Sequence, residues 1–393
     1  LKTYSIDDIG TLEIDDAISI ESVSRNYKLW IHIASPASYV KYDGLIDKNA
    51  RRLISTLYLS TTTIYMFPEV LINEIFSLSD KEKRKALSLG VIFNEDGSVC
   101  SSEIVQSLIK PNYQLSYNDA DELIDYSPKE EEDLGIISRI LEKRKSWRKT
   151  FGAREILESN GRIKVIDNIP SIKVTDPTLS RLLISEAMIL YGDLISDFTR
   201  RNNIPVPYRV QECSNDVSSE RLSTQDNNIL NNFLLKKSMG RSYYSSKPLR
   251  HNSLGLKCYL HATSPIRRYA DLLVHYQLNR FLNNKDLISS EAIDKHIHQI
   301  NNIGRENINR YREDQKFWIR KWFENNQFTE YNVLLLNWIN RYKNICIIYF
   351  IEYNFSTICL LKTKFDVDSG DKLTVKNISN NYNDMITLEL ISY

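Results

Sequence analysis

The sequence predicts an α+β protein in which a large mixed α/β domain precedes a small all-β barrel. Three features of the 393 residues lead to this prediction: short β-type runs near the start, segments of helical period in the middle, and closely spaced alternating runs at the end. Hydrophobic residues make up 42% and charged residues 26%, which is typical of a folded globular chain. We expect the first domain to span residues 1–325 and the second to span residues 326–393.

The N-terminal part alternates β-type runs with turns. The runs are YSI, AISIE, KLWIHIA and LSLGVIF. From Glu131 onward the period becomes helical, with Leu134, Ile137 and Leu141 on one face. The acidic run 130–133 favours a helix N-terminus there, because carboxylates interact favourably with that end of the helix dipole.

The rest of the chain continues this mixture and then changes to strands. Two further helices are expected over 179–198 and 264–281, and the charged segment 306–324 is expected to be a connecting helix. The runs VLLLNWI, NICIIYFI, STICLL, KLTVKNI and MITLELI follow, with turn residues such as Asp368 and Gly370 between them. Five short strands within about sixty residues favour a small barrel of the OB type.

Composition excludes some classes of protein and leaves others open. No apolar stretch reaches the roughly 18 residues that a membrane span needs, so we expect no membrane association. The five cysteines are far apart and form no CxxC pair, which is typical of reduced thiols inside a cell. The net charge is only +1, so binding to nucleic acid requires a local basic groove.

An acidic loop lies between the first two β-type runs. In SIDDIGTLEIDDAISIE it holds Asp7, Asp8, Glu13, Asp15 and Asp16. Hard cations such as Mg²⁺ need several oxygen ligands close together, and hydrolysis of a phosphodiester by paired metals needs carboxylates that hold ions about 4 Å apart. The spacing does not match a calcium EF-hand. The loop alone fits a metal site and an exposed acidic hairpin about equally well, and we assign Asp8 to the exposed role.

A pair of arginines follows a helix-start signal in HATSPIRRYADLLVH. Ser264 suits the N-cap and Pro265 the first helical position, which places Arg267 and Arg268 in the first turn. Cations there oppose the helix dipole unless an anion binds, and free backbone N–H groups attract phosphate. The sequence thus indicates an anion site, with solvated arginines paired to distant acidic residues as the alternative. Beside the acidic loop, the pair supplies the cation that a phosphoryl transition state requires.

Taken together and in order, these motifs resemble the catalytic domain of the ribonuclease II/ribonuclease R (RNB) family of 3′-to-5′ exoribonucleases. That family shows an acidic loop of the form TID…DxDDA, a VHIADVS-like strand, a YLP…PMLP segment and TSPIRRYxD. This chain has SIDDIGTLEIDDAIS, LWIHIASPASYV, LYLSTTTIYMFPEVLINEIFSL and ATSPIRRYADLLVH. The resemblance extends from about Ile6 to Phe323, and the OB-type tail resembles the RNA-binding domain that ends these enzymes.

The resemblance implies roles in catalysis and metal binding. The implied catalytic residues are Asp15, Asp16 and Arg267, with the arginine contacting the scissile phosphate. The implied metal ligands are Asp7, Glu13, Asp15 and Asp16, and the implied cofactor is Mg²⁺, with Mn²⁺ as the alternative. Glu13 stands where the family usually has Asp, which preserves the charge and lengthens the side chain by one methylene.

The resemblance also implies residues that contact RNA. They are Tyr58, Tyr117, Glu186, Arg267 and Arg268. Tyr58 matches an aromatic residue that clamps the 3′-terminal base, and stacking of this kind tolerates any base. Tyr117 and Glu186 match positions that contact the terminal nucleotides and favour ribose. A carboxylate at the edge of an apolar stripe needs a partner, and a ribose hydroxyl is the expected partner of Glu186.

The implied activity is processive 3′-to-5′ hydrolysis of single-stranded RNA to nucleoside 5′-monophosphates by Mg²⁺-activated water, in RNA decay or processing. We expect a monomer without an obligate protein partner. The abundance of Ile, Asn, Lys and Tyr, together with Glu13, which occurs in cyanobacterial and plastid-type relatives, favours a plastid stroma or a bacterial cytoplasm. Two alternatives stay open: a catalytically weak or inactive RNA-binding member of the same fold, and a carboxylate-dependent nuclease that acts on DNA.

Overall fold

A six-stranded sheet forms the centre of the large N-terminal part of the protein. The structure is a computed structural model that describes residues 1–24, 26–213, 228–379 and 385–393. In spatial order the strands are β7 (Val99–Ile109), β6 (Arg84–Phe93), β3 (Asn26–Ala34), β2 (Asp16–Val23), β1 (Thr3–Asp7) and β8 (Tyr113–Ser116). Neighbouring strands are antiparallel except β1 and β8, which are parallel.

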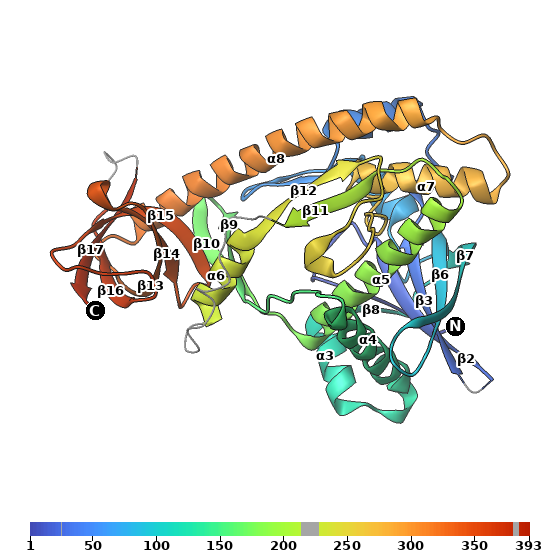
Figure 1. Ribbon diagram of the computed structural model, residues 1–393, viewed down its shortest axis with the longest axis horizontal. Coiled ribbons are helices and arrows are strands. Elements are labelled where there is room, and N and C mark those ends of the chain that lie inside the picture. Colours follow the sequence, from blue (N-terminus) through green and yellow to red (C-terminus); the bar gives the residue numbers. More distant parts are fainter. Residues whose placement is uncertain (25, 214–227, 380–384) are drawn as a thin grey trace.

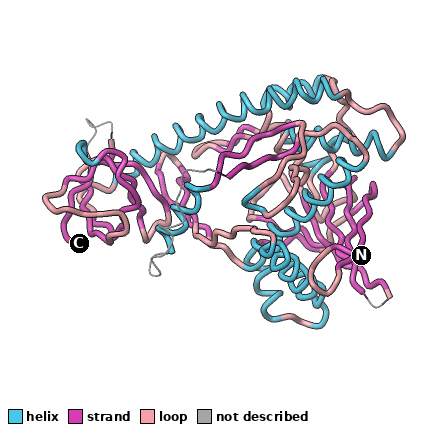
Figure 2. The backbone as a smooth tube through the Cα atoms, in the orientation of Figure 1, coloured by secondary structure: helices cyan, strands magenta, loops and turns pink. Residues whose placement is uncertain are grey.

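Both faces of this sheet are covered, and the strands alternate to fill both cores. Ile18, Leu29 and Ile31 point into one core, which also contains α3 (Tyr117–Tyr126), α4 (Glu132–Thr150) and α5 (Leu179–Arg201). Ala17 and Ala34 point into the other core, with α1 (Leu45–Leu53), α7 (Tyr269–Leu282) and the first turns of α8 (Ser290–Asn325). Figure 2 shows the helices on either side of the strands.

Smaller elements connect and cover this unit. They are the hairpin of β4 (Leu57–Tyr58) and β5 (Thr63–Ile64), α2 (Glu69–Leu71), the hairpin of β9 (Asn160–Ile166) and β10 (Ile169–Thr175), and β11 (Tyr208–Cys213), which pairs with β12 (Met239–Ser245), with α6 (Asn228–Ser238) before β12. A π-helical turn covers Ile72–Phe76. The strand β12 of this pair contacts α8, and Figure 1 shows the pair beside the helix.

A closed barrel ends the chain. Its strands are β13 (Glu330–Asn340), β14 (Ile345–Phe350), β15 (Phe355–Lys362), β16 (Lys372–Asn377) and β17 (Ile386–Ser392), in the order β13-β14-β15-β17-β16. In Figure 1 the helix α8 runs along the molecule and leads into the barrel. Trp322 and Phe323 near the end of α8, with Ile163 of β9, belong to the barrel core. The helix is thereby anchored to both parts of the protein.

The α+β class, the mixed α/β part and the C-terminal barrel are confirmed, and each predicted run of the barrel is a strand. The helix predicted over 264–281 begins later, at Tyr269, because Arg268 has an extended backbone (φ −132°, ψ 123°). The connecting helix predicted over 306–324 is longer and spans all of α8. No helix among the described residues is long and apolar enough to cross a membrane.

Candidate active site

The acidic loop lies at one end of two neighbouring strands. Asp7 is the last residue of β1 and Asp16 is the first residue of β2. Because β1 and β2 are antiparallel neighbours, both carboxylates lie at the same edge of the sheet. The loop prediction is therefore confirmed as far as position is concerned, and the partners of each side chain decide what it can do.

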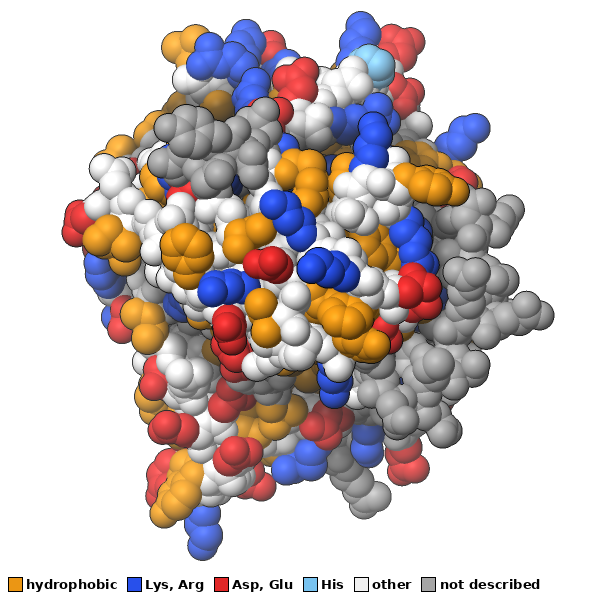
Figure 3. Space-filling view, turned by 90° about the vertical axis from the view of Figure 1, so that its left-hand side faces the viewer, with side chains coloured by type: hydrophobic (Ala, Val, Ile, Leu, Met, Phe, Trp, Pro, Cys, Tyr) orange, Lys and Arg blue, Asp and Glu red, His pale blue; other side chains and the backbone are white. Residues whose placement is uncertain are grey.

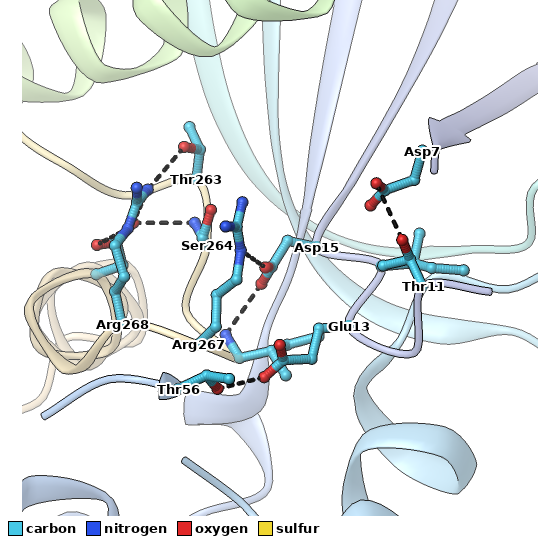
Figure 4. A network of polar contacts seen from close by, with 12 residues as sticks. Asp7, Thr11, Glu13, Asp15, Thr56, Thr263, Ser264, Arg267 and Arg268 are labelled. Carbon is cyan, nitrogen blue, oxygen red and sulfur yellow. Dashed lines mark hydrogen bonds and ion pairs between the residues drawn. The ribbon is translucent and has the colours of Figure 1, made fainter. Parts of the chain in front are cut away.

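Asp15 is buried and binds both the backbone and a side chain of the turn that contains Ile266 and Arg267. Its Oδ1 accepts a hydrogen bond from the Ile266 backbone N–H at 3.0 Å, and its Oδ2 accepts one from Arg267 Nε at 3.1 Å. The side chain is 1% exposed. Burial raises the pKa of Asp15 well above its usual value, against the lowering effect of the Arg267 charge. Asp15 thus fixes the position of Arg267, as Figure 4 shows.

The two arginines differ in what they have left to offer. Arg267 uses only Nε for Asp15, its terminal nitrogens have no partner among the described residues, and its side chain is 41% exposed. Arg268 instead holds the fully buried Asp271 with Nε and Nη2 and donates to Thr263. Arg267 can therefore receive an anion with both terminal nitrogens, whereas Arg268 uses Nε and Nη2 for contacts within the protein.

The helix-start prediction for this pair is wrong, and the reason is tertiary. The Ser264 N–H donates to Asp271 and the Ile266 N–H donates to Asp15, so that these donors are no longer available at a helix end. Arg267 lies in a turn before α7, and the backbone of Arg268 forms an isolated antiparallel β-bridge with Ser55. The guanidinium of Arg267 is positioned by Asp15. Because Arg267 lies before the first residue of α7, the argument that a cation in the first turn opposes the helix dipole does not apply to it.

Glu13, one of the implied metal ligands, is bound by two hydroxyl groups of the protein. Its Oε1 accepts from Thr56 Oγ1 at 2.6 Å, and its Oε2 accepts from the Tyr58 hydroxyl. Asp15 is likewise occupied. Accordingly, the part of the chain that the structure describes contains no group of three or more His, Cys, Asp or Glu side chains placed to hold a metal. The roles of Asp7, Glu13, Asp15 and Asp16 as metal ligands remain predictions.

Asp7 and Asp16 remain, and they suit one hard cation. Asp7 Oδ1 accepts from the Asp8 N–H at 2.7 Å and from Thr11 Oγ1, while the Asp16 carboxylate has no hydrogen-bond donor among the described residues. Burial, and then the charge of Asp7, raise the pKa of Asp16 to about 7. Mg²⁺ is commonly held by one or two carboxylates together with substrate phosphates. The donor set fits that mode.

A cavity of about 210 Å³ opens beside Asp7. It lies between the acidic loop and the start of α3, and it is lined by Ser5, Asp7, Asp8, Ile9, Gly10, Thr11, Ile14, Gln114, Leu115, Ser116 and Asp119. Ser116 and Asp119 form a capping box that fixes this end of α3. The carboxylate of Asp7 is therefore at the boundary between protein and solvent-accessible space.

Two tyrosines lie near these groups. The Tyr58 side chain is 46% exposed, and its hydroxyl is bound to Glu13. Tyr117 is the first residue of α3, and the Arg181 guanidinium lies over its ring at 3.9 Å from the ring centre. Arg181 also forms an ion pair with Asp8, which gives Asp8 a role outside any metal site. The roles of both tyrosines in binding RNA remain predictions.

Glu186 has a partner within the protein. Its oxygens accept from Arg148 Nε at 2.8 Å and from Arg148 Nη2 at 2.5 Å, and Arg148 also donates to the Leu254 carbonyl. Glu186 is 3% exposed. The apolar stripe around it was interpreted correctly, but the charge that satisfies it comes from α4. The implied contact of Glu186 with ribose remains a prediction.

This buried pair leads to a prediction about stability. Replacing Arg148 by Met should lower the free energy of unfolding by about 3–5 kcal/mol, because it leaves the buried Glu186 carboxylate without its partner. Urea denaturation measures the change. Arg139→Met is the matched control, since Arg139 is an exposed residue of the same helix and should change stability by about 0.5 kcal/mol or less. Equal effects of the two variants would show that the pair does not carry the stability.

Sequence reasoning missed the residues that bind the predicted ones. They are Thr56, Arg148, Arg181 and Asp271. Asp271 could have been found, because it stands three residues after Arg268 and such pairs meet on a helix. For the other three the chain gives no local signal, since their partners lie 38 or more residues away.

Comparisons with known proteins bear on the fold and the family. The RNB domain family model matches residues 1–284. An uncharacterized ribonuclease of Synechocystis sp. is 34% identical over 97% of this chain and 57% of its own length. The chloroplastic/mitochondrial ribonuclease II of Arabidopsis thaliana is 36% identical over 73% of this chain and 36% of its own length. The chain thus spans about half the length of the curated relatives it matches.

Solved structures show the same fold. The apo form of Mycoplasma genitalium RNase R superposes with a TM-score of 0.87, at 21% identity, over 100% of this chain and 71% of that one. The same protein has been solved in complex with ribose methylated single-stranded RNA. Yeast Ssd1, a pseudonuclease, superposes with a TM-score of 0.68, at 15% identity, over 95% of this chain and 50% of that one. The fold is therefore shared by nucleases and by a protein described as a pseudonuclease.

Proposed function

Because this chain belongs to the RNB domain family, we propose that it is a 3′-to-5′ exoribonuclease that hydrolyses single-stranded RNA processively to nucleoside 5′-monophosphates. The observation that carries the proposal is the arginine of the TSPIRRY motif. Arg267 presents a partly exposed guanidinium, anchored by Asp15, at the sheet edge where β1 ends at Asp7 and β2 begins at Asp16. A cation and two carboxylates in one place suit the hydrolysis of a phosphodiester.

Each residue contributes a definite task to that reaction. The Arg267 terminal nitrogens donate to the oxygens of the scissile phosphate, on which charge develops in the transition state. Asp15 holds the guanidinium in position through Nε. Asp7 and Asp16 are the residues that would hold Mg²⁺, or Mn²⁺ in its place. The bound ion would supply a water of lowered pKa and a charge that stabilises the leaving oxygen.

We propose that aromatic side chains near the site and the surface of the barrel bind the RNA. Tyr58 offers a half-exposed ring, and Tyr117 offers a ring backed by Arg181. Seen from the barrel end, hydrophobic side chains are mixed with Lys and Arg (Figure 3). Large exposed apolar residues on the barrel include Ile339, Tyr342, Ile358, Phe365, Ile391 and Tyr393. Stacking surfaces and cations in combination are what proteins use to bind single strands without sequence preference.

A labelled-RNA assay tests the proposed function. RNA labelled at its 5′ end should shorten stepwise from the 3′ end in the presence of Mg²⁺, and RNA labelled at its 3′ end should release a labelled mononucleotide at once. A DNA oligomer of the same sequence and a circular RNA should remain intact. Cleavage of the circle would indicate an endonuclease, and equal turnover of DNA would support the carboxylate-dependent DNA nuclease instead.

A non-catalytic RNA-binding protein of the same fold is the second candidate. Two observations favour it: Glu13 is occupied by Thr56 and Tyr58, and the fold superposes on a pseudonuclease. In the same assay this candidate binds RNA and releases no product at any Mg²⁺ or Mn²⁺ concentration.

For either function, we propose that the protein is located in a plastid or in a bacterial cell, in line with the relatives from Arabidopsis thaliana and Synechocystis sp..

Metal binding should depend on pH with a definite sign. The pKa of Asp16 is raised from 3.8 to about 7 in the folded protein, so the folded state binds more protons than the unfolded state between these values. Without metal, Asp16 therefore lowers stability as pH rises through that window. A bound cation removes this cost, and protons compete with it at low pH.

Mg²⁺ should consequently raise the melting temperature by a few degrees at pH 8 and by much less at pH 5. Differential scanning fluorimetry with and without the ion measures this difference. Asp16→Asn should lose the dependence on Mg²⁺ while keeping the fold. An equal shift at both pH values, or in both proteins, would place the ion elsewhere.

A further inference from the structure

Both carboxylate oxygens of Glu13 are taken by one neighbouring segment, residues 54–58, which we call the clamp segment. Thr56 Oγ1 donates to Oε1 at 2.6 Å, and the Tyr58 hydroxyl donates to Oε2. Glu13 is 4% exposed, so no water competes freely for these oxygens. A buried carboxylate with two hydroxyl donors needs no cation to be satisfied.

The clamp segment also forms backbone hydrogen bonds with the turn that contains Arg267 and with the start of α7. The Thr56 N–H donates to the Arg267 carbonyl at 3.0 Å, and the Tyr269 N–H donates to the Ile54 carbonyl at 2.8 Å. Ile54 has a φ of 65°, which is strained for a β-branched residue and costs of order 1–3 kcal/mol. Such strain persists only where neighbouring contacts fix the backbone. Glu13 therefore connects the acidic loop to a segment that is itself fixed against Arg267.

The backbone of the loop leaves little freedom at Glu13. The Ile14 N–H donates to Ser77 Oγ at 3.3 Å, and the Leu78 N–H donates to the Ile14 carbonyl at 2.9 Å. An aspartate at position 13 is shorter by one C–C bond, about 1.5 Å. From a backbone held in this way, we expect an aspartate to lose at least one of the contacts with Thr56 and Tyr58.

We propose that Glu13 is a positioning residue that tethers the Tyr58 hydroxyl and so orients its ring for the 3′-terminal base, and that it is not a metal ligand. The proposal rests on the proposed function only in taking RNA as the ligand. The Tyr58 ring is 46% exposed and held at its far end, which leaves its faces free for stacking. The metal is then left to Asp7 and Asp16.

Two substitutions at position 13 distinguish a metal ligand from a residue that positions Tyr58, because the two roles predict opposite orders of severity for the two variants. Glu13→Gln keeps the length, and its amide can accept from Thr56 and donate to Tyr58, whereas Glu13→Asp keeps the charge and loses the reach. A metal ligand tolerates Asp better than Gln; a tether tolerates Gln better than Asp. We measure binding of RNA with a fluorescent 3′-terminal base analogue in EDTA, where metal plays no part. Glu13→Asp should weaken binding and stacking roughly 3- to 10-fold, and Glu13→Gln should resemble the wild type.

Tyr58→Phe keeps the ring and removes only the tether, so it should reproduce the loss seen in Glu13→Asp. The double variant Glu13→Asp/Tyr58→Phe should be no worse than either single variant, because both remove the same contact. Multiplying effects would overturn the tether. Thermal melting of each variant controls for folding.

Metal affinity provides the independent measurement. Mn²⁺ binding is followed by electron paramagnetic resonance on the protein with a phosphorothioate RNA. Glu13→Gln should leave the Mn²⁺ affinity within about twofold of the wild type, and Asp16→Asn should lower it at least tenfold. A loss in Glu13→Gln as large as that in Asp16→Asn would make Glu13 a ligand and overturn the proposal. A wild type that binds RNA and releases no product would contradict the proposed exoribonuclease and leave the tether supported.

Discussion

The Asp16→Asn variant is expected to lose RNA hydrolysis by more than about 100-fold and to keep its affinity for RNA. Loss of a group that merely supports a metal ligand already costs roughly 10- to 100-fold, and Asp16 is proposed as a ligand itself. Its carboxylate accepts no hydrogen bond from the described residues, so the amide leaves no donor unsatisfied and the fold should persist. The substitution removes a negative charge near the phosphate, which reduces repulsion, so we expect RNA affinity to be kept.

Single-turnover hydrolysis and RNA binding in EDTA are measured on the same preparation. Asp125→Asn serves as the matched control, because it removes one carboxylate at an exposed position of α3. It should change neither quantity by more than about twofold. A fully active Asp16→Asn protein would refute the proposed role of Asp16, whatever its effect on RNA binding.

Several strands of the sheet and the place of the acidic loop between two of them could be predicted because they depend on local pattern. Alternation in KLWIHIA puts Leu29, Ile31 and Ile33 in one core, and the loop between two strands necessarily puts Asp7 and Asp16 at one edge. The barrel strands were likewise predicted from alternation. What the pattern could not supply was the partner of each charge.

Partners are decided by tertiary contacts between distant segments. Glu186 was expected to need a ligand, and it is satisfied by Arg148 from another helix. Ser264 was expected to cap a helix, and its N–H is taken by Asp271. In both cases the sequence indicated that a polar group needs a partner, and the partner found in the fold is a side chain that the sequence pattern does not identify.

Replacing Arg267 by Lys should lower the rate of hydrolysis by about 100- to 1000-fold and weaken RNA binding much less. Lysine keeps the charge but loses the planar fork, so it cannot bind Asp15 through Nε and present two further donors to phosphate. Removal of one well-placed donor to a developing oxyanion costs roughly that much in rate. Single-turnover rates at saturating RNA, compared with RNA affinity, separate the two effects.

Arg268→Met is the comparison for this experiment. Arg268 holds the buried Asp271 with Nε and Nη2, whereas Arg267 uses only Nε within the protein. Its loss should therefore appear mainly as a lower free energy of unfolding, measured by urea denaturation. A variant of Arg268 that is stable and inactive would reverse the assignment of the two arginines.

The contribution of Asp15 can be separated from that of Arg267 by combining substitutions. An asparagine at position 15 offers one acceptor where the Ile266 N–H and Arg267 Nε both donate, so the guanidinium loses its anchor. Asp15→Asn should therefore slow hydrolysis nearly as much as Arg267→Lys. If Asp15 acts only through Arg267, the double variant should be little slower than either single variant. Effects that multiply would mean that Asp15 also acts on the reacting groups themselves.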